Sequence, residues 1–219
     1  IVSHGDLELN QFQHLLFLAN YDVSAKADLV PIGATAIYAL GLYTSKGYAS
    51  PADIPQGGEV AIPNDPTNQA RALLVLQSAH LVSLKDGGNA LSTPADVLPG
   101  SKVKVVPVDA NQTAVQLKSL DAAIINNNFA YDAKIDPTTA IYSDLKDPSA
   151  ADPYINVWVA KKADADNPVY QKLIAIYHDK AVTDELLKEN GGTALISDKS
   201  PAELQQILSG LEDLVRKSS

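Results

Sequence analysis

The stretch EVAIPNDPTNQARALLVLQSAH, residues 59–80, indicates the fold class more clearly than any other part of the chain. Residues 59–63 are short and apolar, as in a buried strand, and residues 64–68 form a turn rich in side chains that cap helices. From residue 69 to residue 80, apolar residues recur at helical spacing. A strand, a tight polar turn and a helix make half of a βαβ unit, which predicts an α/β fold.

The same alternation continues on both sides of this stretch. Further strands are predicted at residues 28–35, 102–108, 121–126 and 154–160. Further helices are predicted at residues 12–18, 111–120, 168–178, 182–190 and from Ser200 onward. Strands that alternate with helices predict a mostly parallel sheet with helices on both faces.

The last predicted helix has the strongest start signal in the chain. Ser200 suits the N-cap, Pro201 the first turn, and Glu203 completes a capping box. The apolar residues that follow are three and four apart, which predicts one buried face: Leu204, Ile207, Leu208, Leu211, Leu214 and Val215.

Composition excludes several classes of protein. The chain has 219 residues, enough for one large or two small domains, and a net charge of -9, which argues against nucleic-acid binding. No apolar run approaches the roughly 18–20 residues that span a bilayer. Cysteine is absent, so disulfides and cysteine metal sites are excluded. The start at Ile1 does not resemble a signal peptide, and we expect a mature or trimmed chain.

Motifs for catalysis and metal binding are missing. The sequence has no Walker loop, no G-x-G-x-x-G and no G-x-S-x-G. The four histidines show no metal-ligand spacing, so we expect no metal and no cofactor. Only His14 is a credible general base, which leaves an enzyme acting on a small anion as a minor hypothesis.

Arg71 is the first candidate for binding. It lies near the N-terminus of the predicted helix, where free N–H groups and a partial positive charge favour an anion. A guanidinium adds a fork that matches a carboxylate. The alternative is a surface arginine paired with Asp65 or Asp53.

Polar residues at the ends of strands are the other candidates. Asn126, Asn127 and Asn128 follow an apolar strand and either form a turn or line a crevice beyond the sheet. Asn156 interrupts the apolar run at 154–160 and either faces solvent or satisfies a buried partner.

Phe12 and His14 flank Gln13 in a segment with few charges. By default we expect core packing for Phe12 and a satisfied hydrogen bond for His14.

Read in order, several segments resemble the methionine-binding lipoprotein (MetQ/NlpA) family of ABC-importer substrate-binding proteins. These are GDLELNQFQH at 5–14, GLYTSK at 41–46, VAIPNDPTNQARALL at 60–74, DAAIINNNFA at 121–130 and PYINV at 153–157. The resemblance covers nearly the whole chain, and the segment at 60–74 is the most specific.

The resemblance implies a two-lobed, periplasmic-binding-protein-like (type II) α/β fold with a ligand cleft between the lobes. Lobe one is expected to comprise residues 1–39 and 154–219, and lobe two residues 40–153. Family members usually begin with a further segment that supplies the first strand of lobe one and a lipidated cysteine. We expect that segment to be absent from this chain.

The resemblance also assigns six ligand-binding residues: Phe12, His14, Arg71, Asn126, Asn128 and Asn156. In the family pattern, the arginine holds the ligand carboxylate. The asparagines at 126 and 156 contact the amino-acid backbone, with the one at 128 a weaker match. The aromatic residue and the histidine border the side-chain pocket.

The function implied is an extracytoplasmic, lipid-anchored or periplasmic protein that delivers an amino acid, methionine first, to an ABC-importer permease. Hinge closure would bury the ligand without any reaction, and the lipid anchor lies outside this chain. This chain departs from the usual residues of the family beside the pocket and the hinge, at Gln11, Leu15-Leu16 and Tyr38-Ala39. Another amino acid, a short methionine-containing peptide, or a non-transport relative with an enzymatic or adhesive role stays open.

Overall fold

The computed structural model describes residues 2–146 and 151–218, and the chain divides into two compact units. Unit 1 contains Ile1–Tyr38 and Ser149–Ser219, and unit 2 contains Ala39–Pro148. The chain therefore passes from unit 1 to unit 2 and back again.

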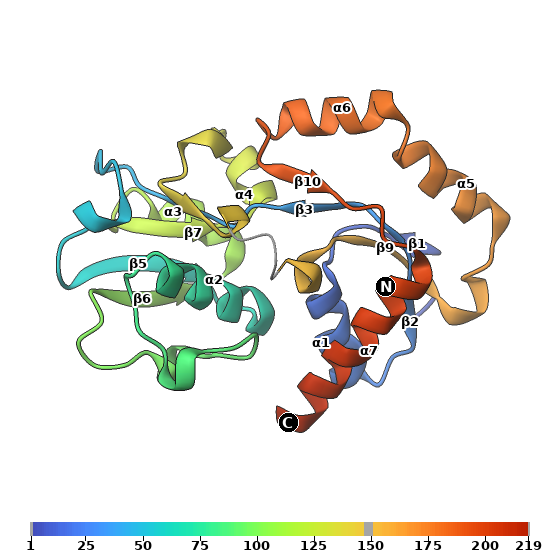
Figure 1. Cartoon of the computed structure of the whole chain (residues 1–219), viewed down its shortest axis with the longest axis horizontal. Helices are drawn as coiled ribbons and strands as arrows, with labels where there is room; N and C mark the ends of the chain where they lie inside the picture. Colours follow the sequence, from blue (N-terminus) through green and yellow to red (C-terminus); the bar gives the residue numbers. More distant parts are fainter. Residues whose placement is uncertain (1, 147–150, 219) are drawn as a thin grey trace. The chain divides into compact units, whose positions relative to one another are not determined.

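Unit 2 is built around a five-stranded sheet in the order β6-β5-β7-β4-β8 (Figure 1). The strands are β4 (Gly41–Tyr43), β5 (Gly58–Pro63), β6 (Val103–Val108), β7 (Ala122–Ile125) and β8 (Tyr142–Ser143). β5 is parallel to β6 and β7, whereas β4 is antiparallel to β7 and to β8. The predicted mostly parallel sheet is thus wrong for β4 and β8, because β4 enters directly from unit 1 and not through a helical crossover.

Helices cover both faces of this sheet, as predicted: α2 (Pro66–Ser78), α3 (Thr113–Gln116) and α4 (Asn127–Asp132). Val60 and Ile62 of β5 belong to the core that α2 closes, whereas Ala61 belongs to the core on the side of α3 and α4. The helix predicted at 111–120 is shorter than expected. No helix was predicted at α4, where the sequence offered a turn or a crevice lining for the asparagines.

Unit 1 holds two small antiparallel sheets, so the expectation of a parallel sheet is wrong in this unit. One sheet has the order β1-β9-β2, and the other pairs β10 with β3. The strands are β1 (Leu9–Asn10), β2 (Leu29–Ala34), β3 (Ala36–Tyr38), β9 (Val157–Lys161) and β10 (Ala194–Ile196).

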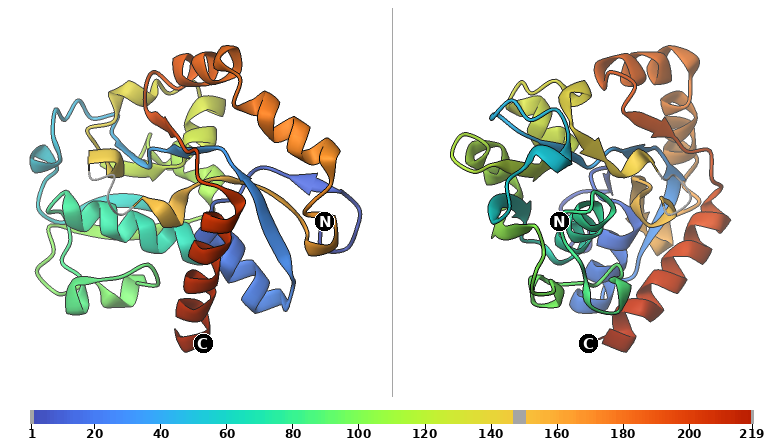
Figure 2. Two further views of the ribbon diagram at one scale, coloured as in Figure 1. Left: turned by 45° about the vertical axis from the view of Figure 1, so that its right-hand side comes forward. Right: turned by 60° about the vertical axis from the view of Figure 1, so that its left-hand side comes forward.

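In the described part of unit 1, the α-helices are α1 (Leu15–Ala25), α5 (Pro168–Tyr177), α6 (Lys180–Glu189) and α7 (Pro201–Ser218). α7 runs alongside α1, as both views of Figure 2 show. The predicted capping box of α7 is confirmed, since Glu203 accepts hydrogen bonds from the backbone N–H and the hydroxyl of Ser200. α5 approaches β2 so closely that a Cβ at Gly33 would lie 2.7 Å from the Ile174 side chain.

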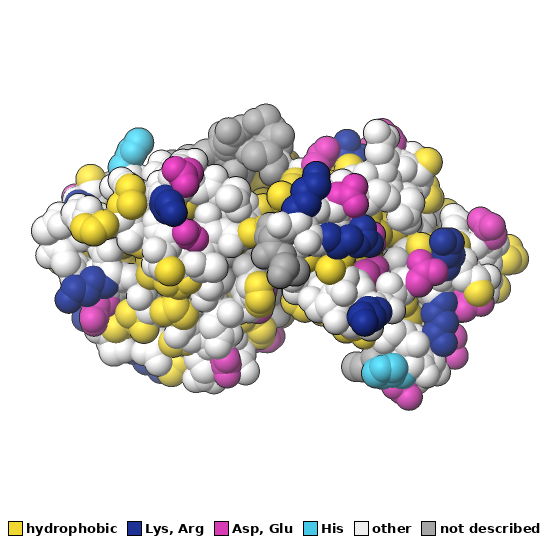
Figure 3. All heavy atoms as spheres, turned by 90° about the horizontal axis from the view of Figure 1, so that it is seen from below, with side chains coloured by type: hydrophobic (Ala, Val, Ile, Leu, Met, Phe, Trp, Pro, Cys, Tyr) yellow, Lys and Arg dark blue, Asp and Glu magenta, His cyan; other side chains and the backbone are white. Residues whose placement is uncertain are grey.

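The surface mixes charges of both signs. On the face drawn in Figure 3, acidic and basic side chains are interspersed on each unit, without the continuous basic field that suits a nucleic-acid backbone. Within residues 2–146 and 151–218, no helix has the length and apolar character needed to cross a bilayer.

Candidate functional site

The start of α2 is fixed by local hydrogen bonds. The Asp65 carboxylate accepts a hydrogen bond from the backbone N–H of Asn68 at 3.0 Å, so the helix begins at Pro66, earlier than the predicted residue 69. The same carboxylate accepts from the Asn68 side-chain amide. Asn68 and Arg71 are three residues apart and therefore lie on one side of the helix.

Arg71 is buried, with 5% of its surface exposed. Its Nε donates to Asp144 Oδ2 at 2.6 Å. The alternative of a surface arginine paired with Asp65 or Asp53 is therefore wrong. Both of those carboxylates cap their own turns, Asp65 at α2 and Asp53 beside Ser50.

Asp144 connects Arg71 to the backbone. Its other oxygen, Oδ1, accepts from the backbone N–H of Leu40 at 2.9 Å. The β4–β8 ladder pairs Gly41 with Ser143, so Leu40 and Asp144 stand at the next position. There the chain turns into a 3-10 helix, Asp144–Lys146, and the carboxylate takes the place of a backbone acceptor.

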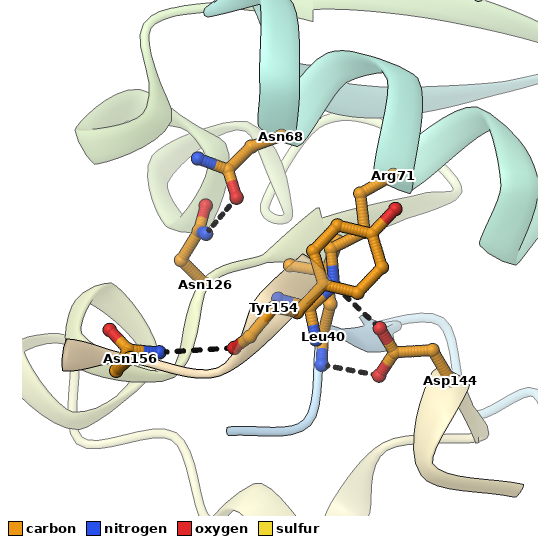
Figure 4. A network of polar contacts seen from close by, with 7 residues as sticks. All are labelled: Leu40, Asn68, Arg71, Asn126, Asp144, Tyr154 and Asn156. Atoms are coloured by element: carbon orange, nitrogen blue, oxygen red, sulfur yellow. Dashed lines mark hydrogen bonds and ion pairs between the residues drawn. The ribbon is translucent and has the colours of Figure 1, made fainter. Parts of the chain in front are cut away.

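Asn126 lies where β7 ends and is the N-cap residue of α4, although its side chain makes no capping bond. Its amide Nδ2 donates to Asn68 Oδ1 at 3.1 Å, as Figure 4 shows. Its amide oxygen is buried and, within the described residues, has no hydrogen-bond partner. A buried acceptor without a donor is costly to the fold, and it can accept a hydrogen bond from a bound polar group.

These contacts place two complementary groups near each other in unit 2. Asn68, which Asn126 contacts, and Arg71 are one helical turn apart on α2. A guanidinium binds a carboxylate, and an unmatched amide oxygen accepts from a donor such as an ammonium group.

Asn128 is exposed on α4 and lies outside this network. Asn126 is the N-cap of α4, and Asn127 and Asn128 lie within this helix, so the alternative of a simple turn is wrong. The crevice alternative stays a prediction for Asn126.

In unit 1, Phe12 and His14 belong to an aromatic patch with Phe17 and Tyr154. His14 is buried and caps α1, with Nδ1 accepting from the Phe17 backbone N–H at 3.1 Å. The imidazole packs edge-on against Tyr154, with ring centroids 5.5 Å apart. The expected hydrogen bond of His14 is therefore confirmed, and it uses the Nδ1 lone pair that a general base would need there.

Phe12 is 68% exposed and packs edge-on against Phe17, with ring centroids 5.8 Å apart. Core packing, the default expectation for this residue, is wrong. An exposed aromatic ring beside a buried histidine is available to contact an apolar group.

Asn156 precedes β9, since that strand begins at Val157 and not at Tyr154 as predicted. Its backbone N–H donates to Ala36 at 2.9 Å, and its carbonyl accepts from the Thr35 backbone N–H at 2.9 Å. Its side-chain Nδ2 donates to the Tyr154 carbonyl at 3.4 Å, as Figure 4 also shows. Asn156 is therefore the residue directly before the strand and does not interrupt it.

Asn68 and Asp144 were not predicted as site residues. Asn68 lies within the most specific motif, so its place beside Arg71 was available from helical spacing alone. Asp144 is 73 residues from Arg71 and had no local signal. Within the described residues, no group of three or more histidine, aspartate or glutamate side chains could hold a metal ion.

Comparison with known proteins gives consistent matches over most of the chain. The sequence profile of the NlpA lipoprotein family matches residues 1–197. The probable D-methionine-binding lipoprotein MetQ of Haemophilus influenzae is 34% identical over 193 residues, which cover 85% of this chain and 68% of that protein.

Two solved structures are similar at comparable identity. The substrate-binding protein of a methionine transporter from Streptococcus pneumoniae is 36% identical, with a TM-score of 0.82 over 90% of this chain and 78% of that one. A nutrient-binding protein from Burkholderia cenocepacia, solved with methionine bound, is 35% identical, with a TM-score of 0.80 over 90% and 81%.

Proposed function

Because the chain belongs to the NlpA lipoprotein family, we propose that it is an extracytoplasmic substrate-binding protein that delivers an amino acid, methionine first, to an ABC importer. Two related structures support this proposal. One was solved with methionine bound, and the other is the substrate-binding protein of a methionine transporter. The permease is the expected protein partner. The names of the relatives as lipoproteins support a location in the cell envelope.

One observation carries the proposal: the buried Arg71 lies one helical turn along α2 from Asn68, and Asn68 contacts Asn126, whose buried amide oxygen has no partner among the described residues. Arg71 would hold the ligand carboxylate, and Asn126 Oδ1 would accept from the ligand ammonium. The side chain of Asn68 orients this amide, because its oxygen accepts from Asn126 Nδ2.

The chemistry of an amino acid fits these groups. A zwitterion that leaves water loses the solvation of both its charges, and it binds only where the protein replaces that solvation. Charge-assisted hydrogen bonds to a guanidinium and an amide oxygen do so without any bond being made or broken.

The other predicted residues stay in the proposal for the rest of the ligand. Phe12 and His14 belong to an aromatic patch that suits a thioether, with sulfur–aromatic contacts worth about 0.3–1.5 kcal/mol. Asn156 is proposed to contact the amino-acid backbone. Asn128 has the weakest support because it is exposed and outside the network around Arg71.

Thermal unfolding in the presence of single L- and D-amino acids and short methionine peptides tests the proposal. A ligand at a hundredfold excess over its Kd should stabilise the chain by about 2.7 kcal/mol, and we expect methionine to do so. If no compound of the panel shifts the unfolding temperature, the proposed function is wrong.

We predict that Asn126→Ala weakens methionine binding about tenfold, because the ammonium loses a buried acceptor. The 2-oxo acid analogue of methionine keeps the carboxylate and the thioether but has no ammonium, so its affinity should change less than threefold. Titration calorimetry of both compounds measures the difference.

Asn111→Ala is the matched control for this variant, since Asn111 is an exposed asparagine of the same unit. It should leave both affinities unchanged. Equal losses for methionine and for the 2-oxo acid in Asn126→Ala would show that Asn126 does not bind the ammonium group.

A further inference from the structure

Arg71 carries a counter-charge supplied by the protein itself. The guanidinium is 5% exposed, and Asp144 lies 2.6 Å from its Nε with a side chain that is 21% exposed. The pair as a whole is therefore neutral, although Arg71 alone offers a positive charge to a ligand.

The backbone holds Asp144 in this position. One carboxylate oxygen accepts from the Leu40 N–H and the other from Arg71, so the side chain is fixed at two points. A carboxylate fixed in this way stays beside the guanidinium when a ligand arrives. It accepts from Nε, and the two terminal nitrogens carry the remaining N–H donors of the guanidinium.

We propose that Asp144 sets the net charge of the ligand that this site accepts, favouring a zwitterion over an anion. This inference rests on the proposed function, since it assumes that Arg71 binds the ligand carboxylate. A zwitterion adds no net charge to the neutral pair, whereas a carboxylate without an ammonium leaves one uncompensated negative charge in a poorly solvated site.

The charge of Asp144 acts on the two ends of an amino acid with opposite sign. It repels the carboxylate on Arg71 and attracts the ammonium beside Asn126. Both effects discriminate against ligands that have the carboxylate alone. Asp144 is thus a specificity-determining residue, even though its own contacts are with Arg71 and Leu40.

The test measures two dissociation constants in Asp144→Asn, one for methionine and one for its 2-oxo acid analogue. The quantity of interest is the Kd of the 2-oxo acid divided by the Kd of methionine. Asparagine removes the charge and keeps one acceptor for the Leu40 N–H. Any loss of position at Arg71 weakens both compounds alike, so the ratio reports the charge. We expect the ratio to fall at least about fivefold from its wild-type value.

Asp121→Asn is the matched control. Asp121 lies in the same unit, and its carboxylate accepts hydrogen bonds from the backbone N–H of Glu59 and from the hydroxyl of Tyr48. It should leave the ratio unchanged, whatever it does to stability. Should Asp144→Asn fail to fold by circular dichroism, Asp144→Ser provides the same test.

Every outcome decides the proposal. A ratio that falls by less than fivefold, a fall that Asp121→Asn shares, or a folded variant that binds neither compound overturns the role of Asp144. In each of these cases the proposed function still stands if the wild-type protein binds methionine. A wild-type chain that binds neither methionine nor any other amino acid overturns both.

Discussion

Replacing Arg71 by alanine is expected to weaken methionine binding at least about a hundredfold, which titration calorimetry would register as a loss of measurable heat. The ligand carboxylate would be left without its charged partner in a buried site, where truncating one member of such a pair costs about 2–5 kcal/mol. The change also leaves Asp144 without its ion pair to Arg71, so we expect a fall of about 1–3 kcal/mol in the free energy of unfolding.

Arg216→Ala provides the control for this variant. Arg216 also pairs with carboxylates, those of Glu212 and Asp213, but its side chain is 55% exposed in α7. Surface ion pairs contribute about 0–1 kcal/mol, and we expect methionine affinity to be unchanged. Wild-type affinity in a folded Arg71→Ala protein would rule out the assigned role of Arg71.

Replacing Asp22 by asparagine should stabilise the protein at pH 8 by about 2–4 kcal/mol. Asp22 lies on α1 and is 5% exposed. Burial raises the pKa of its carboxyl to about 7, the carboxylates of Glu212 and Asp28 add to this, and the Leu29 backbone N–H opposes it. The folded chain therefore binds this proton more tightly than the unfolded chain does.

The sign of the pH dependence follows from the raised pKa. In the wild type, the contribution of Asp22 to the free energy of unfolding is fully present below pH 3.8. It decreases as the pH rises from 3.8 to about 7 and does not change further above that. Asparagine does not titrate, so Asp22→Asn should lack this decrease with pH. The free energies of unfolding of the two proteins should therefore become equal near pH 4. Chemical denaturation between pH 4 and pH 8 measures both curves.

Asp164→Asn removes a charge from the same unit at an exposed position and should shift stability by less than about 0.5 kcal/mol. Should Asp22→Asn leave the slope between pH 4 and pH 7 as it is in the wild type, Asp22 is not the group that titrates.

Elements with local signals could be predicted from the sequence. The helix start at Pro201 follows from a serine whose side chain accepts from the backbone N–H of Glu203, whereas α2, predicted to start at residue 69, starts three residues earlier at Pro66 behind its Asp65 cap. The apolar spacing after each start then places most of the buried face, as Leu204 and Leu208 of α7 show, although Leu214, predicted on that face, is exposed. Both signals act within a few residues and need no knowledge of the rest of the chain.

Features that depend on distant segments could not be predicted in the same way. The direction of β4 depends on where the chain enters unit 2, which no residue of β4 reports. The partner of Arg71 lies 73 residues away, while nearby Asp65 and Asp53 looked equally suitable. α4 has only six residues, too few for apolar periodicity to show.

A crystal structure of the chain grown with methionine tests the central claim most directly. The account predicts electron density for the ligand in unit 2, with its carboxylate on the Arg71 guanidinium and its ammonium within hydrogen-bond distance of Asn126 Oδ1. Density for methionine that contacts neither of these two groups would contradict it.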